Sequence, residues 1–364
     1  MSNFYKRFIQ TYCTEMGAER SSLRVLFGNR SSRVTKMISF YEKIVDSITR
    51  KLSKNKVSIS LVYKNNYFID NLEQFEVTYN SLCDENSKTR FIQYIVFKAI
   101  NSTGLKFPTG HMDASIDIKS VSKLTITDDF IKGYTNIGNL NLYDLSPIGY
   151  DVKLINESVG TLIDFVYEQY AYRELFGVKK DDVVIDCGGA IGDTAIYFAA
   201  KGASSVYVFE FIRSNIALIN KQIELNPSME TKIKVIEKAV WNESKVELSY
   251  LDKGNSSSVA DAGVYPDSTT TLSIDDMVLE NKLEHVDMIK MDIEGAESPA
   301  LMGAQDTIRK FKPKLAICVY HKNSDLVKIP NYIKSLNPDY DFYFEYYTDV
   351  GWEAVLYAVN REET

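Results

Sequence analysis

The chain has 364 residues, 45% of them apolar and 25% charged, which is enough to bury a large core and to form two domains. No apolar run approaches the roughly 18 residues of a membrane-spanning helix, and the first ten residues lack the apolar stretch of a signal peptide, so we expect a cytoplasmic protein. The net charge of −7 disfavours nucleic acid as a partner.

The first 60 residues are basic, with 12 Lys and Arg against 4 Asp and Glu. Between Arg33 and Lys54, apolar residues recur at intervals of three and four, which predicts an amphipathic helix. A basic helix of this kind could attract an anionic acceptor or make weak contact with a membrane surface, but a helix packed on its neighbours has the same pattern, and we favour packing. Its basic residues are Lys36, Lys43, Arg50 and Lys51.

The rest of the N-terminal region shows no chemical motif. Residues 57–63 alternate like a strand, and residues 87–100 predict a helix capped by Ser87. Residues 101–145 contain many turn-forming residues between short apolar runs. We therefore expect residues 1–150 to form an α+β accessory domain of unknown role. The four cysteines are widely spaced without a Cys-x-x-Cys pair, which predicts reduced thiols.

Strands and helices alternate over residues 151–364, which predicts a parallel sheet covered on both faces. The last two strands are separated by only four residues, so they must form an antiparallel hairpin. This doubly wound, Rossmann-like α/β sheet is similar to that of class I methyltransferases. The expected strands are 182–186, 205–209, 233–240, 286–291, 314–320, 341–347 and 352–359. The expected helices are 193–201, 214–225, 274–280 and 299–310, the last with Ser298 as its cap and Pro299 in its first turn.

The segment VVIDCGGAIGDTAIYFA has the pattern of a cofactor loop between a strand and a helix. Glycines let the backbone approach a ligand closely, and the helix N-terminus offers free amides. Ala190 breaks the Gly-x-Gly-x-x-Gly pattern of a dinucleotide site, which disfavours an NAD-linked oxidoreductase. Glu210 ends the next strand, where a carboxylate can accept both ribose hydroxyls. The predicted cofactor-binding residues are Asp186, Gly188, Gly189, Gly192, Asp193, Thr194, Glu210 and Asp292.

Simpler explanations exist for these positions. The glycines could belong to a plain strand-to-helix turn, and Glu210 could be a surface acid at the end of a strand. Asp193 and Thr194 could cap the helix without touching a cofactor. The glycine loop and the acid occur together in the expected register, and this favours the cofactor site.

Three further features complete a resemblance to the FkbM family of S-adenosylmethionine-dependent methyltransferases. They are the acid in VFEF and the runs VDMIKMDIEGAE and KPKLAICVYHK. The resemblance covers about residues 165–345, and it implies O-methylation of sugars or polyketide-type hydroxyls, in natural products and cell-surface glycans. Many members have Asn where this chain has Ala190, so one polar contact to the cofactor is not carried over to this chain. We expect a methyltransferase that acts on a sugar hydroxyl in a cell-surface glycan or its precursor.

The acceptor should react at the carboxyl ends of the fourth and fifth strands, where Asp292 and His321 lie. Methyl transfer is an in-line displacement that needs an aligned acceptor and help in removing the hydroxyl proton. We expect His321 as the base, because its free pKa lies near neutrality, with Asp292 orienting it or holding the acceptor, and Glu294 nearby. The alternative is a hydrogen-bonded strand end and a capping cluster that includes Glu297.

Other functions and mechanisms stay open at this point. Three carboxylates and an imidazole could bind Mg²⁺ or Mn²⁺ and acidify the acceptor, although no fixed metal spacing supports this. The Gly/Ser-rich stretch from Lys253 to Ser268 could be a lid or an ordinary loop. A catalytically inactive cofactor-binding fold that serves as an interaction module is the functional alternative, and the polar residues at the reacting edge favour catalysis. Oligomeric state is not predicted.

Overall fold

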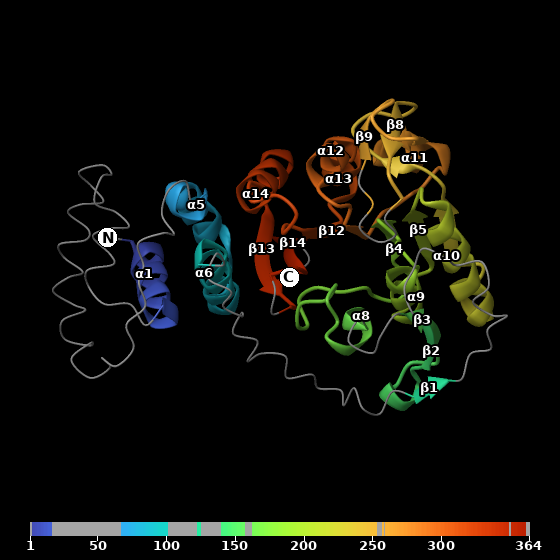
Figure 1. Ribbon diagram of the computed structural model, residues 1–364, viewed down its shortest axis with the longest axis horizontal. Helices are drawn as coiled ribbons and strands as arrows, with labels where there is room; N and C mark the ends of the chain where they lie inside the picture. The colour runs from blue at the N-terminus through green and yellow to red at the C-terminus, as the bar shows by residue number, and fades with distance from the viewer. Residues whose placement is uncertain are drawn as a thin grey trace. The chain divides into compact units, whose positions relative to one another are not determined.

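The computed structural model describes residues 2–16, 67–100, 122–124, 140–156, 162–252, 257, 259–348 and 351–361. The chain divides into two compact units (Figure 1). The first comprises Met1–Pro108 with Asp349–Gly351, and the second comprises Thr109–Thr348 with Trp352–Thr364. The helix expected at 33–54 and the strand expected at 57–63 lie outside the described residues. The division into an accessory domain and a catalytic domain near residue 150 stays a prediction.

Aromatic side chains form the core of the first unit. Its described helices are α1 (Asn3–Met16), α4 (Tyr67–Asp70), α5 (Leu72–Ser81) and α6 (Glu85–Ile100). The rings of Phe68 and Phe75 stack with their centroids 5.6 Å apart, and the ring of Phe4 packs against Tyr79 at 5.3 Å. Short helices gain most of their stability from tertiary packing of this kind. None of the described helices combines the length and apolar character needed to cross a membrane.

Helix α6 begins earlier than the sequence predicted. It starts at Glu85, and Oδ1 of Asp84 accepts a hydrogen bond from the backbone N–H of Ser87 at 2.6 Å. The side chain of Asp84 thus satisfies a free amide of the first helical turn. The prediction that Ser87 caps this helix is therefore wrong.

A seven-stranded sheet forms the centre of the second unit, with strand order β13-β14-β12-β11-β4-β5-β6. All neighbouring pairs are parallel except the two that involve β14, which pairs antiparallel with β12 and β13. This confirms the predicted class I methyltransferase sheet and its terminal hairpin. The strands are β4 (Val183–Cys187), β5 (Ser205–Phe209), β6 (Ile233–Ile236), β11 (Met288–Met291), β12 (Lys314–Cys318), β13 (Tyr340–Tyr346) and β14 (Ala354–Asn360). The chain order reverses between β4 and β11, which is where open α/β sheets bind ligands.

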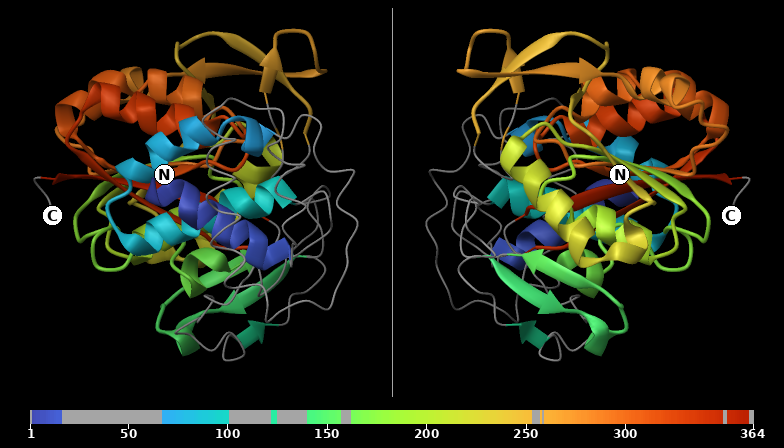
Figure 2. Two further views of the ribbon diagram at one scale, coloured as in Figure 1. Left: turned by 90° about the vertical axis from the view of Figure 1, so that its left-hand side faces the viewer. Right: turned by 90° about the vertical axis from the view of Figure 1, so that its right-hand side faces the viewer.

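Helices cover both faces of this sheet (Figure 2). Helices α8, α9 and α10 lie on one face, and α11, α12, α13 and α14 lie on the other. Their bounds are α8 (Ile163–Val166), α9 (Asp193–Ala200), α10 (Arg213–Leu225), α11 (Ile274–Glu280), α12 (Glu297–Met302), α13 (Gln305–Phe311) and α14 (Asp325–Leu336), and a 3-10 turn, η6 (Pro227–Met229), follows α10. Strands β4, β11 and β12 are near-continuous apolar runs because both faces of the sheet are covered.

The helix expected at 299–310 is two helices, α12 and α13. A Cβ on Gly303 would lie 2.1 Å from the carbonyl oxygen of Trp241, so only glycine allows this close backbone approach, and the helix is interrupted there. Helix α12 begins at Glu297 after Ala296, and no side chain caps it. The prediction that Ser298 caps the helix is therefore wrong, because Ser298 lies inside the first turn.

The strand expected at 233–240 is also two strands. The first part is β6, and the second is β7 (Ala239–Val240), which pairs with β10 in a separate sheet of order β7-β10-β8-β9. The other strands of that sheet are β8 (Glu247–Tyr250), β9 (Val259–Asp261) and β10 (Asp267–Leu272). The sequence did not predict this small sheet. It includes part of the stretch considered as a lid, while residues 253–256 and 258 lie outside the described residues.

A three-stranded antiparallel sheet packs on helix α10. It consists of β1 (Ser122–Leu124), β2 (Asn141–Asp144) and β3 (Lys153–Asn156), with a 3-10 turn, η4 (Ser146–Ile148), between the last two. The side-chain amide of Gln222 bonds both backbone groups of Ile155, at 2.9 and 2.7 Å, and Asn226 does the same for Lys153. These amides complete the edge of β3, as a neighbouring strand would.

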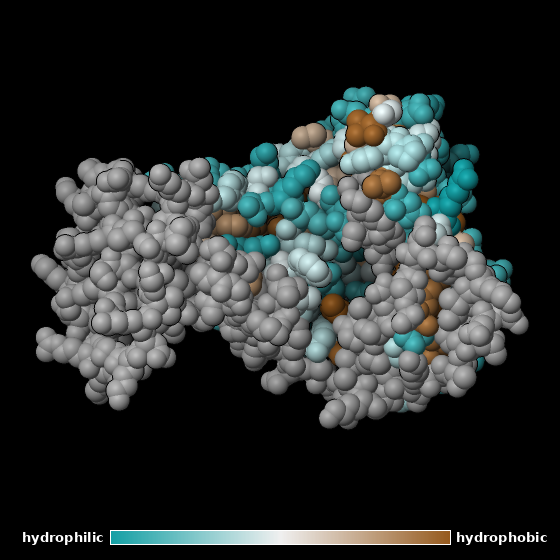
Figure 3. Space-filling model, in the orientation of Figure 1, coloured by the Kyte–Doolittle hydropathy of each residue, from teal (hydrophilic) through white to brown (hydrophobic). Residues whose placement is uncertain are grey.

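The described surface of the second unit is mostly hydrophilic on the face shown in Figure 3, with small, separate apolar areas. The large apolar side chains that are exposed in this unit include Leu175, Leu279 and Met302, from different elements. Scattered residues of this kind are normal on a globular protein.

Candidate cofactor and acceptor site

Glycines bring the loop after β4 against the neighbouring strands. Gly188 has φ +84°, and a Cβ added there would lie 2.0 Å from the carbonyl oxygen of Asp292. A Cβ on Gly189 would lie 2.2 Å from Cγ1 of Val208, and Gly192 precedes α9 with φ +91°. The protein's own packing therefore requires glycine at the first two positions. The loop is held at the point where β4 and β11 end side by side.

A buried ion pair between β4 and β11 stabilises the same loop. Asp186 has no exposed surface, and its carboxylate lies 3.0 Å from Nζ of Lys290 and accepts a hydrogen bond from Thr194 Oγ1 at 2.6 Å. Lys290 also donates to the carbonyl oxygen of Gly188 at 2.7 Å. Burial opposes the charged form of Lys290, but the carboxylates of Asp186 and Asp292 outweigh it and raise its pKa. Lys290 therefore stays charged.

These contacts bear on two predicted cofactor ligands. The carboxylate of Asp186 and the hydroxyl of Thr194 bond to each other and hold the loop in place, and Lys290 is the partner that the sequence analysis missed. The available signal was a lysine in the fully buried strand MIKM, because a buried charge needs a partner. Direct contact of Asp186 or Thr194 with the cofactor stays a prediction.

Glu210, the predicted ribose ligand, is buried and well anchored. One carboxylate oxygen accepts hydrogen bonds from the backbone N–H groups of Phe211 and Ile212, at 2.7 and 2.8 Å, and the other accepts from the side chain of Asn215 at 3.2 Å. Burial raises the pKa of Glu210, and these hydrogen bonds oppose the rise. The arrangement fixes the direction of the carboxylate before any ligand binds.

Glu210 lines an open cleft at the carboxyl ends of the strands. Ala190 lies in the cleft wall with φ +43°, a left-handed conformation in which Asn is more favourable than Ala. The cleft is lined by Gly188, Ala190, Glu210, Asn215, Asp292 and Glu294, among others. It thus joins the predicted cofactor residues to the predicted acceptor residues.

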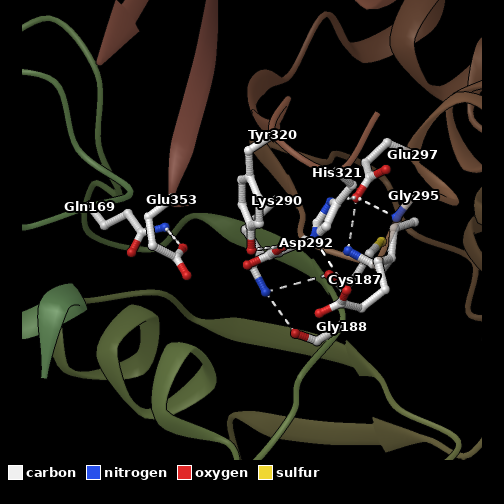
Figure 4. Close-up of polar contacts among 12 residues, drawn as sticks. Gln169, Cys187, Gly188, Lys290, Asp292, Gly295, Glu297, Tyr320, His321 and Glu353 are labelled. Carbon is white, nitrogen blue, oxygen red and sulfur yellow. Dashed lines mark hydrogen bonds and ion pairs between the residues drawn. The ribbon is translucent and has the colours of Figure 1, made fainter. Parts of the chain in front are cut away.

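The structure brings the predicted acidic run and the histidine together at the end of β11 and β12 (Figure 4). Nδ1 of His321 lies 2.8 Å from Oε1 of Glu297, and Nε2 lies 3.4 Å from Asp292 and 3.6 Å from Glu294. Oε1 of Glu297 also accepts a hydrogen bond from the backbone N–H of Ile293 at 3.1 Å. One imidazole therefore connects three carboxylates.

The comparisons with known proteins agree with this geometry. Residues 186–358 match the model of the methyltransferase FkbM domain. These residues form an FkbM-family methyltransferase domain. The enzyme is therefore an S-adenosylmethionine-dependent methyltransferase, which favours the catalytic interpretation over the inactive binding module. Among curated proteins, none matches the chain.

The chain is also similar to solved structures. The methyltransferase FkbM from Methylobacillus flagellatus KT shares 18% sequence identity with this chain and has a TM-score of 0.53, with 88% of this chain and 70% of that chain covered. The Aeropyrum pernix fibrillarin in complex with natively bound S-adenosyl-L-methionine has 13% identity and a TM-score of 0.33, with 65% of this chain and 99% of that chain covered. The first likeness shows the fold.

In the FkbM domain, the surroundings of His321 change its expected protonation. Burial lowers the pKa of His321, but the ion pair with Glu297 and the charges of Asp292 and Glu294 outweigh it and raise the pKa to about 9. The expectation of a pKa near neutrality is therefore not met. At neutral pH the imidazole is charged, and it stabilises negative charge on the neighbouring carboxylates.

A second group of polar residues near Asp292 was not predicted from the sequence. Tyr320 and Tyr170 donate hydrogen bonds to the two carboxylate oxygens of Asp292, at 3.0 and 3.4 Å. Gln169 donates to Glu353 at 2.6 Å. Figure 4 shows Asp292 between the Glu297–His321 pair and the Glu353–Gln169 pair. No motif marks Glu353 or Gln169, because they come from the β13–β14 connection and from the segment after α8.

Glu353 has an unusual conformation and environment. Its φ is +56°, a left-handed conformation that is rare for glutamate and that the surrounding structure must stabilise. Burial, and then the charge of Asp292, raises the pKa of Glu353 to about 7. One oxygen of each carboxylate and Sγ of Cys318 lie within 4.8 Å of one another. Asp292 and Glu353 therefore border the same small space.

The metal alternative gains no support from these contacts. Ligand-capable atoms of Asp292, Glu297 and His321 do lie within 4.8 Å of one another. Hydrogen bonds from backbone amides and the ion pair with His321 already engage Oε1 of Glu297, so internal contacts explain the cluster without an ion.

Proposed function

We propose that the enzyme transfers a methyl group from S-adenosylmethionine to a hydroxyl group of an uncharged, sugar-type acceptor in a cell-surface glycan or its precursor. The observation that carries this proposal is the pair of carboxylates, Asp292 and Glu353, at the reacting edge of the sheet. Carboxylates accept hydrogen bonds from hydroxyl groups. The charge of Asp292 repels phosphate and carboxylate groups, a charged Glu353 adds to this repulsion, and the repulsion is strong where water is partly excluded.

Asp292 is the group best placed to take the hydroxyl proton. Tyr320 and Tyr170 donate hydrogen bonds to its carboxylate, and charged His321 lies 3.4 Å away, so all three stabilise its negative charge. When bound, S-adenosylmethionine would supply the methyl group, with S-adenosylhomocysteine as the leaving group. The hydroxyl that donates to Asp292 gives up its proton to this carboxylate as the oxygen forms its new bond to carbon. His321 then acts by stabilising charge, and Glu297 keeps it charged.

Glu353 is suited to hold a second polar group of the acceptor. Gln169 fixes the carboxylate with a hydrogen bond of 2.6 Å, and one oxygen of Glu353 lies within 4.8 Å of one oxygen of Asp292. A sugar offers neighbouring hydroxyl groups, so one can bond Glu353 while the other reacts beside Asp292. Holding the acceptor at two points restricts its orientation, as an in-line displacement requires.

Methyl transfer to a panel of acceptors tests this proposal. The panel pairs neutral methyl glycosides with the matching uronic acids and sugar phosphates, and the readout is label from tritiated S-adenosylmethionine in each product. We expect label in methyl ethers of neutral glycosides, and we expect Glu353→Gln to raise KM for the acceptor more than it lowers kcat. The control is Glu280→Gln at an exposed glutamate. Label in the anionic members alone, or on nitrogen, would contradict the proposal.

A cytoplasmic location is part of the proposal. Cys187 and Cys318 carry free thiols, and such thiols suit a reducing compartment. Fractionation of cells that express the chain, with antibody detection of full-length protein, tests the location.

A further inference from the structure

The side-chain amide of Gln169 connects the two carboxylates at the reacting edge of the sheet (Figure 4). Its nitrogen donates to Glu353 at 2.6 Å and to the hydroxyl of Tyr170 at 3.3 Å. The hydroxyl of Tyr170 donates in turn to Asp292 at 3.4 Å. The positions of the two carboxylates relative to each other therefore depend on where the main chain places Gln169 and Tyr170.

A pair of buried tyrosines fixes the main chain at Gln169. The hydroxyl of Tyr357, on β14, donates to the carbonyl oxygen of Gln169 at 2.6 Å. A carbonyl group can only accept and a phenol has one proton, so Tyr347 is the donor in the bond of 2.7 Å between the two phenols. Burial raises the pKa of Tyr357, so its hydroxyl keeps the proton that the bond to Gln169 requires.

The packing of Tyr357 does not need its hydroxyl group. The centroid of its ring lies 5.4 Å from that of Tyr172 and 5.1 Å from that of Phe176, in an aromatic cluster. A phenylalanine would fill this space without burying a polar group, and a buried hydroxyl is costly unless it is bonded. What the hydroxyl adds to the ring is a directed bond to the main chain of Gln169.

The residue before Gln169 is held by separate contacts. Glu168 has φ +49°, and its carboxylate lies 2.7 Å from Nζ of Lys201 and accepts a hydrogen bond from Tyr150 at 3.0 Å. The segment thus has a second fixed point that does not involve Tyr357. Loss of the Tyr357 hydroxyl should therefore shift the amide of Gln169 while the segment stays folded.

We propose that Tyr357, supported by Tyr347, is a positioning residue for the methyl acceptor. It acts through the main chain of Gln169, whose amide orients the carboxylate of Glu353 beside that of Asp292. Methyl transfer requires an aligned acceptor, and a small displacement of a group that holds it weakens the alignment. The part of the acceptor rests on the function proposed above, whereas the control of Glu353 by Tyr357 can be measured without an acceptor.

Titration of Glu353 in the full chain tests this control. Tyr357→Phe keeps the ring and removes the hydroxyl, so Gln169 should bond Glu353 less well. The pKa of Glu353, about 7 in the wild type, should rise by about 0.5 or more, because the bond from Gln169 favours the charged carboxylate. The readout is the infrared band of the protonated carboxyl group, taken as the difference from the same protein with Glu353→Gln. The other charges that act on Glu353 are unchanged, and they belong to Asp292, Lys290 and His321.

Tyr340→Phe is the matched control. Tyr340 lies at the other end of the same hairpin, and its buried hydroxyl donates to the carbonyl oxygen of Pro313 at 2.7 Å. This variant should leave the pKa of Glu353 unchanged. Gln169→Met removes the amide and should raise the pKa by itself. Tyr357→Phe added to Gln169→Met should cause no further rise, because Tyr357 acts through Gln169.

Methyl transfer to a neutral methyl glycoside gives the second readout. In Tyr357→Phe, KM for the glycoside should rise by about threefold or more, kcat should change less, and the affinity for S-adenosylhomocysteine should equal that of the wild type. Tyr347→Phe removes the donor to Tyr357, and it should act in the same direction. If the wild type methylates no neutral glycoside, the proposed acceptor is wrong, and the titration of Glu353 decides the positioning role.

Two results would overturn the inference. An unchanged pKa of Glu353 in a folded Tyr357→Phe protein would show that the hydroxyl does not control this carboxylate. A further rise on adding Tyr357→Phe to Gln169→Met would show that Tyr357 does not act through Gln169. If Tyr357→Phe does not fold, Tyr347→Phe takes its place in each measurement and is judged by the same results.

Discussion

Nδ1 of His321 lies 2.8 Å from the carboxylate of Glu297, a side chain with no exposed surface. This contact determines the charge of the imidazole at the reacting edge of the sheet. It connects a residue at the end of β12 to the first turn of α12, so the charge depends on how the strand and the helix pack.

The pKa of His321 should therefore be about 9 in the folded protein, above the value of an unperturbed histidine. A raised pKa stabilises the fold fully below about pH 6.5, and this stabilisation is lost as pH rises through about 9. The rise of the His321 pKa from about 6.5 to about 9 corresponds to about 3 kcal/mol in the free energy of unfolding. Nuclear magnetic resonance titration of the imidazole in wild type and Glu297→Gln measures it. A pKa near 6.5 in the wild type would refute the role of Glu297.

Replacement of Lys290 by Met should strongly destabilise the protein. The variant leaves the carboxylate of Asp186 buried without its cation, which typically costs about 3–5 kcal/mol. The double variant Lys290→Met with Asp186→Asn should recover part of the loss, because it removes the unpaired charge. Urea denaturation of the three proteins measures the free energies of unfolding. A loss below about 1 kcal/mol in Lys290→Met would show that the pair is unimportant.

Glu210→Gln should weaken the binding of S-adenosylhomocysteine by about 1–3 kcal/mol, because ribose hydroxyls lose a charged acceptor. Glutamine keeps one oxygen for the amides of Phe211 and Ile212, whereas alanine would leave both amides without an acceptor. Calorimetry gives the dissociation constants, and Glu230→Gln at an exposed glutamate is the matched control. An unchanged dissociation constant in a folded Glu210→Gln protein would show that Glu210 has only a structural role.

Gly188→Ala should disrupt the cofactor loop. Its Cβ would lie 2.0 Å from the carbonyl oxygen of Asp292, so the loop or β11 must move. Gly263 is a close control, because its φ of +82° matches the +84° of Gly188 and a Cβ there meets nothing within 4 Å. Gly263→Ala should lower the free energy of unfolding by only about 1 kcal/mol, because a residue with a Cβ is less stable than glycine at this positive φ. Thermal unfolding and calorimetric binding of S-adenosylhomocysteine are measured for both variants. Similar melting temperatures and affinities in the two variants would show that the clash at Gly188 does not occur.

The sheet, its hairpin and the cofactor loop could be predicted because each has a local signal. A buried parallel strand is a continuous apolar run, and the loop after β4 carries its glycines within a few residues of Asp186. The terminal hairpin followed from a connection too short for a crossover. The same local patterns placed Glu210 and His321 at strand ends.

The remaining parts of the site depend on contacts between distant segments. Glu353 lies outside any motif, and only the packing of the β13–β14 hairpin brings it close to Asp292 at the reacting edge. The charge of His321 depends on the burial of Glu297, which sequence spacing does not reveal. The prediction of Ser298 as a cap failed because α12 begins at Glu297, two residues before the predicted start, and no side chain caps it.

The role of Asp292 is the most direct test of the proposed mechanism, and single-turnover methyl transfer to a neutral glycoside measures it. Asp292→Asn removes the proton acceptor but keeps the side-chain size, so the rate should fall by about 100-fold or more, while the affinity for S-adenosylhomocysteine changes by only a few-fold. Chelator should leave the wild-type rate unchanged. A folded Asp292→Asn protein that transfers methyl groups at the wild-type rate would contradict the mechanism.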